Sequence, residues 1–109
     1  MGAVIQLATQ TEIERIQSAL TSYDEYTEIH AIDNPPLYMG LKSLERYLEG
    51  GEEFTRKEIV SIKEKALHEA KVEQRFAKQC CDISNDGANP VALECANDIV
   101  EAIEAVEII

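Results

Sequence analysis

The fold is decided by residues 55–83, which read TRKEIVSIKEKALHEAKVEQRFAKQCCDI without a glycine or a proline. Thr55 is followed three residues later by Glu58, a reciprocal capping pattern that starts helices. The next glycine is Gly87. The pattern therefore predicts one helix over residues 56–83, about 40 Å long at ~1.5 Å per residue.

This predicted helix carries two apolar stripes. The broad stripe contains Ile59, Val60, Ile62, Ala66, Leu67, Ala70, Ala77, Cys80 and Cys81. The narrow stripe contains Val72, Phe76 and Ile83. A helix with two apolar stripes either packs between neighbours on both sides or pairs with a second chain. The helix is therefore expected to be the central element, and the sequence allows a homodimer through helix 56–83.

Two shorter patterns predict helices before it. Apolar residues at helical spacing indicate a first helix that fades near Asp24, namely Ile13, Ile16, Leu20 and Tyr23. Asn34-Pro35-Pro36 then opens a second helix, which Gly50-Gly51 ends. Its apolar stripe is Leu37, Leu41, Leu44 and Leu48. Residues 3–8 and 26–32 are left open between strand, helix and coil.

A last helix is predicted from Pro90 to near the end of the chain, with Asn89 as its cap. Its apolar residues keep the alternating spacing of packed helices, at Ala92, Cys95, Ile99, Ala102, Val106 and Ile109. The four patterns together predict an all-α fold, a single helical domain over residues 1–109 with a long central helix. A short N-terminal strand remains an option.

Charge is the largest deviation in composition. The chain has 21 acidic and 10 basic residues, a net charge of −11. Residues 55–80 hold seven bases and four acids, whereas residues 81–109 hold seven acids and no base. Nucleic-acid backbones and anionic membranes repel such a chain, so we expect neither as a direct partner. Three cysteines, two of them adjacent, are a poor disulfide framework and indicate reduced thiols in the cytoplasm.

Signs of catalysis and of cofactors are missing from the sequence. Zinc sites usually show Cys-x-x-Cys spacing, which Cys80, Cys81 and Cys95 do not have. His68 lies about 18 Å along the helix from Cys80, too far to activate it as a nucleophile. The carboxylates follow solvent-facing positions. We therefore expect no catalytic residue, no cofactor and no enzymatic activity.

One loop does carry metal-binding features. From Asp82 to Gly87 the order of oxygen-bearing side chains and glycine resembles the start of an EF-hand loop. Ligands implied by this resemblance are Asp82, Ser84 and Asp86, with the carbonyl of Ala88 and with Glu94. The twelfth position is Leu93 where the family has a bidentate Glu, and the acid comes one residue later. A calcium-binding helix–loop–helix is therefore the alternative function.

The leading hypothesis rests on the acidic face of the last helix. Five carboxylates lie there without a neighbouring base, Glu94, Asp98, Glu101, Glu104 and Glu107. Such a row steers association with a basic surface and imitates a phosphate backbone. An ordinary solvated helix face is the commoner explanation of such a row. Small size, high acidity and the lack of catalytic motifs nevertheless favour a non-enzymatic protein-interaction module, a class that includes inhibitors and nucleic-acid mimics, over an enzyme.

Overall fold

The computed structural model describes residues 2–50, 53–83 and 87–108, with side chains from Thr11 onward. The elements are four α-helices, α1 (Gly2–His30), α2 (Pro35–Leu48), α3 (Arg56–Ile83) and α4 (Ala88–Glu104). The residues so described contain no strand, and the all-α prediction is confirmed. The short strand allowed for residues 3–8 stays a prediction, because it precedes the first described side chain.

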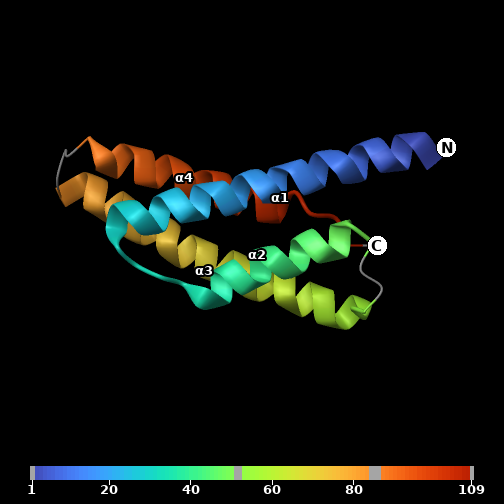
Figure 1. Cartoon of the computed structure of the whole chain (residues 1–109). Helices are drawn as coiled ribbons and strands as arrows, with labels where there is room; N and C mark the ends of the chain where they lie inside the picture. Colours follow the sequence, from blue (N-terminus) through green and yellow to red (C-terminus); the bar gives the residue numbers. More distant parts are fainter. Residues whose placement is uncertain (1, 51–52, 84–86, 109) are drawn as a thin grey trace.

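The helices run alternately up and down along one axis, and the two ends of the chain lie at the same end of the bundle (Figure 1). Contacts join α1 to α4, α4 to α3, α3 to α2 and α2 back to α1. Consequently α1 and α3 stand at opposite corners, and α3 has a neighbour on each side. The same holds for each of the four helices, so these contacts do not single out α3 as the central element.

The start of α3 follows from its capping pair. The Glu58 amide donates to Thr55 Oγ1 at 3.1 Å, and the Thr55 amide donates to Glu58 Oε1 at 3.4 Å. Two amides that have no partner inside the helix are thereby satisfied. The observed bounds of α3 are those predicted, 56–83.

The largest core cluster lies between all four helices. Its largest fully buried side chains are Ile16, Leu37, Leu41, Leu44, Ile59, Ile99, Ile103 and Val106. The predicted stripe of α2 is buried throughout, and so is the seam predicted for the last helix from Ala92 to Val106, while Ile109 lies outside the described residues. Each fully buried aliphatic side chain contributes about 1.5–3 kcal/mol relative to its exposed state.

Helices α2 and α3 approach closely at Gly40. A Cβ atom on Gly40 would lie 2.7 Å from the Cβ of Ala66. No pair of methyl groups tolerates that separation, so the glycine lets the two backbones come together. Gly50, by contrast, ends α2 in the left-handed region at φ 96°, as predicted.

Helix α1 extends six residues beyond Asp24, the position where the prediction had it fade. Tyr26 is 1% exposed, and its ring packs against small side chains of α3 and α4, Ala77, Ala92 and Ala96. The Tyr26 hydroxyl also donates to Glu73 Oε1 at 2.8 Å. Tertiary contacts therefore stabilise the last turns of α1, although this segment has weak helix propensity. The helix ends before Ala31, which has a φ of 53°.

The Glu73 side chain fastens the α1–α2 connection to α3. Its Oε2 accepts from Asn34 Nδ2 at 2.7 Å, while Asn34 Oδ1 accepts from the Leu37 amide and caps α2. The Asn34 amide donates in turn to the Tyr23 hydroxyl at 2.9 Å. Burial is the main cause that raises the pKa of Tyr23, and it does the same for Tyr26 together with the hydrogen bond to Glu73.

The two ends of α4 differ from the prediction. The helix begins at Ala88, and Asn89 is inside its first turn, where its side chain donates to the Cys80 carbonyl at 3.2 Å. The helix ends at Glu104, so Glu107 lies beyond it. A hydrogen bond from the Val106 amide to the Ile103 carbonyl (3.2 Å), over three residues instead of four, tightens this last turn. Lys63 Nζ then donates to the Val106 carbonyl and holds the segment against α3.

The narrow apolar stripe of α3 is only partly covered by the described residues. Val72 and Phe76 are 39% and 37% exposed, and Ile83 is 86% exposed. The Phe76 ring makes one contact with the ring of His30, at 5.2 Å between centroids. Periodicity had suggested an interior face here, but α2 and α4 cover the other sides of the helix. Among the described helices, none combines the length and apolarity that crossing a bilayer requires.

Candidate functional site

All five predicted partner-binding acids are exposed, but they divide into two groups. Asp98 and Glu101 line a hollow of about 360 Å³ between α1 and α4. Glu104 and Glu107 line another, of about 540 Å³, between α3 and the segment after α4. Glu94 lies one turn before Asp98, on the side of the first group. Glu94, Asp98 and Glu101 are called the acidic triad below.

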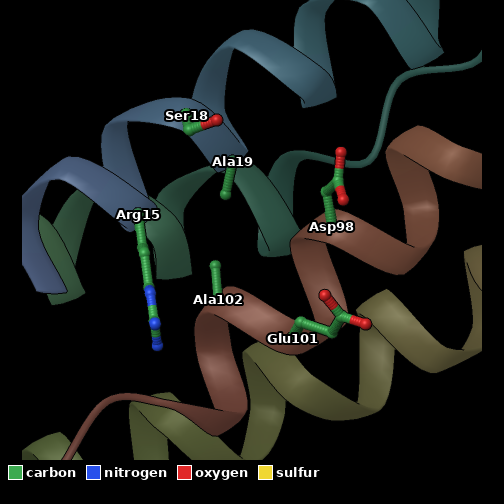
Figure 2. Close-up of a pocket in the computed structure, with 6 residues that line it drawn as sticks. All are labelled: Arg15, Ser18, Ala19, Asp98, Glu101 and Ala102. Atoms are coloured by element: carbon green, nitrogen blue, oxygen red, sulfur yellow. The ribbon is translucent and has the colours of Figure 1, made fainter. Parts of the chain in front are cut away.

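The hollow beside the acidic triad is shaped by small side chains. Ser18 and Ala19 of α1 face Ala102 of α4 across it, and their size leaves the space open (Figure 2). The Asp98 and Glu101 side chains stand on the α4 wall, and Arg15 extends from the α1 wall. No ion pair joins the triad to a basic side chain within residues 11–50, 53–83 and 87–108. The triad therefore presents its charge to solvent.

Helix α1 adds a further acid to this face. Glu25 hydrogen-bonds to the thiol of Cys95, which is 6% exposed on the inner side of α4. Burial, the nearby Glu25 carboxylate and the charges of Asp98 and Glu94 together raise the pKa of this thiol to about 11, with burial as the largest cause. Four carboxylates from two helices thus share one neighbourhood. Sequence reasoning missed Glu25, because it lies 69 residues before Glu94 and belongs to no local motif.

The second group has basic neighbours. Arg56 and Lys63 of α3 line the same hollow as Glu104 and Glu107. The absence of bases from the last stretch of sequence therefore does not mean that these two acids are far from cations in space. These two bases offset part of the field of Glu104 and Glu107, whereas Arg15 is the one base among the described residues that lines the hollow of Asp98 and Glu101. The acidic triad is therefore the stronger candidate for an external partner.

Residues 84–86 of the predicted calcium loop at 82–94 lie outside the described residues, and with them the candidate ligands Ser84 and Asp86. Asp82 is exposed in the last turn of α3, and Glu94 is exposed in the second turn of α4. Within the described part of the chain, no cluster of three or more His, Cys, Asp or Glu side chains could hold a metal ion. The calcium alternative stays a prediction.

The cysteines and histidines form no evident reactive site. Cys80 and Cys81 are half-buried near the end of α3, and Cys95 is buried on α4. His30 packs edge-on against Tyr26 and Phe76, with a buried Nε2 that has no hydrogen-bond partner in the part of the chain described. His68 is exposed on α3.

Comparison of the chain with protein-family models, with curated proteins and with solved structures finds no match.

Proposed function

We propose that this protein is a non-enzymatic interaction module whose acidic face binds a basic surface on a protein target in the cytoplasm. The observation that carries the proposal is the acidic triad with Glu25. Two of these four acids, Asp98 and Glu101, line an open hollow, and none of the four forms an ion pair with a described basic side chain, Arg15 of the same hollow included. The class includes inhibitors that occupy the nucleic-acid site of their target. A homodimer through helix 56–83 stays a prediction beside it.

The spacing of the acids supports a mimic of one strand rather than of a duplex. Residues four and three apart on a helix are separated by about 6 and 4.5 Å along its axis. The triad therefore places one charge roughly every 5 Å along α4, while duplex DNA has one per ~1.7 Å and a single strand one per ~3.4 Å. A groove that accepts a single strand, or a short run of Lys and Arg, fits this density best.

Charge complementarity between two surfaces mainly raises the association rate and determines which partner is bound. Exposed ion pairs contribute about 0.2–1 kcal/mol each, so three or four pairs alone make a weak complex. Complementary fields raise the association rate and repel acidic competitors. The complex is therefore expected to weaken steeply as salt increases, and the net charge of −11 disfavours direct contact with a nucleic acid or an anionic membrane.

The proposal is tested by affinity capture from the native host with three baits. The first is the wild-type chain, and the second is the triple variant Glu94→Gln, Asp98→Asn, Glu101→Gln. The matched control carries the same change in charge at exposed acids elsewhere, Asp33→Asn, Glu49→Gln and Glu64→Gln. We expect the wild type and the control to retain a basic partner, eluted by salt, and the triad variant to lose it. Equal capture by all three baits would show that the triad is not the binding site.

A further inference from the structure

The outward face of α3 carries a cluster of like charges. Lys71, Arg75 and Lys78 are all exposed, four and three residues apart, and are called the basic triad below. Side chains at these spacings are neighbours on a helix surface, and like charges there destabilise the helix. None of the three forms an ion pair with an acid of residues 11–50, 53–83 or 87–108. On α3 itself, Asp82 lies four residues after Lys78, whereas no acid lies three or four residues from Lys71 or Arg75, so most of the charge of this cluster is uncompensated.

Apolar side chains adjoin the basic triad. Val72 and Phe76 follow Lys71 and Arg75 by one residue each, and they are the half-exposed members of the narrow stripe described above. Three cations beside two apolar side chains are complementary to an acidic protein surface, because such a surface presents carboxylates together with apolar side chains. A long polyanion fits less well, because it would continue from the short triad onto a molecule with a net charge of −11.

The acidic triad of the same chain has the matching spacing. Glu94, Asp98 and Glu101 are also four and three residues apart on an α-helix, so each triad spans about 10 Å along its axis. Val91, one turn before Glu94, is 39% exposed and provides the apolar neighbour. When α4 of one molecule lies along α3 of another, three carboxylates meet three cations in register.

We propose that the basic triad of α3 binds the acidic triad of a second copy of this chain. The inference rests on the proposed function in one respect, since it uses the same acidic face. Within one molecule the two triads cannot pair in this way, because the acidic triad adjoins α1, which stands at the corner opposite to α3. The contact is therefore heterologous, and it extends into chains or closes into a ring.

The test uses sedimentation at about 0.15 M salt, where screening over ~8 Å damps repulsion between whole molecules but leaves contacting pairs attractive. One variant removes the bases, Lys71→Gln, Arg75→Gln and Lys78→Gln. The other removes the acids, Glu94→Gln, Asp98→Asn and Glu101→Gln. The matched control removes three exposed bases at the other end of α3, Arg56→Gln, Lys57→Gln and Lys65→Gln. Circular dichroism verifies that all variants keep their helices.

We expect the weight-average mass of the wild type and of the control to rise above the monomer's 12.2 kDa with concentration. Either triad variant alone should associate about tenfold more weakly. A mixture of the two variants should restore association but stop at a 1:1 dimer, since each copy retains only one of the two surfaces. A wild type that stays monomeric, a triad variant that associates like the wild type, or a mixture that forms no dimer would each overturn the inference.

Affinity capture separates this inference from the proposed function. If the acid variant loses its external partner while the wild type stays monomeric, the self-association is wrong and the proposed function stands. If the wild type and the variant mixture associate as expected but the acid variant still captures the same partner, the proposed function fails alone.

Discussion

Replacing Gly40 with alanine tests how closely α2 and α3 must approach. The new methyl carbon would lie 2.7 Å from the Cβ of Ala66 and would also be 4.0 Å from the carbonyl oxygen of Ile62. Two carbon atoms in contact prefer about 3.5–4.0 Å. The helices must therefore separate by about 1 Å at this point, which loosens the packing of Leu37 and Leu41 on either side.

Two effects of opposite sign set the magnitude. Overpacking of a close contact costs about 1–3 kcal/mol. Alanine in a helix interior is favoured over glycine by about 1 kcal/mol. The free energy of unfolding of Gly40→Ala is therefore expected to fall by about 0–2 kcal/mol, although helix propensity alone predicts a rise.

A double-mutant cycle with Ala66→Gly isolates the contact. Ala66→Gly alone removes a buried methyl group and lowers helix propensity, so it destabilises the wild type. In the Gly40→Ala background it also relieves the clash, so its cost should shrink by at least about 1 kcal/mol. Urea unfolding followed by circular dichroism measures all four chains. The reasoning is refuted if Gly40→Ala stabilises the protein by ~1 kcal/mol and the two substitutions are additive.

Four further predictions concern other parts of the bundle. Tyr26→Phe should lower the free energy of unfolding by about 1.5–3 kcal/mol, because it removes a hydrogen bond to the Glu73 carboxylate; an unchanged urea midpoint would contradict this. Thr55→Ala should cost about 1 kcal/mol through the lost cap of α3, also by urea unfolding, with Thr55→Ser as the conservative control. The pKa of Cys95 is raised from 9.0 to about 11 in the fold, so its contribution to stability is full below about pH 9 and is lost as pH rises toward 11. Thermal unfolding between pH 8 and 11 should therefore show a smaller decline in Cys95→Ala than in the wild type. If residues 82–94 do not bind calcium, ~1 mM CaCl2 should leave the melting temperature unchanged, whereas a rise that Asp82→Asn abolishes would establish the alternative.

Much of the fold follows from local sequence. The capping pair at Thr55 sets the start of α3, and the glycine-free run after it sets its length. Asn34 before Pro35 sets the start of α2, since its side-chain Oδ1 accepts from the Leu37 amide as a cap should. These features depend on residues three or four apart, and such short-range chemistry is written directly in the sequence.

Long-range contacts account for what the sequence did not predict. The last turns of α1 are stabilised by burial of Tyr26 and by Glu73, which lies 47 residues away. Periodicity identified the stripe of Val72 and Phe76 but could not tell that both side chains stay partly exposed in the bundle. At the candidate site, the pattern of the last helix identified the three acids of the acidic triad among its five carboxylates. Glu25 joins them only through the packing of α1 on α4, which no local pattern predicts.

The Glu73 carboxylate has a consequence for how the molecule opens. It bonds Tyr26 and Asn34 at once, so the end of α1, the connection to α2 and the middle of α3 meet at one side chain. Amide hydrogen exchange in these three segments should therefore proceed through a single cooperative opening rather than through separate fraying. Glu73→Gln, which retains the shape of the side chain but loses its charge, should accelerate exchange in all three segments together while the capped start of α3 keeps its protection.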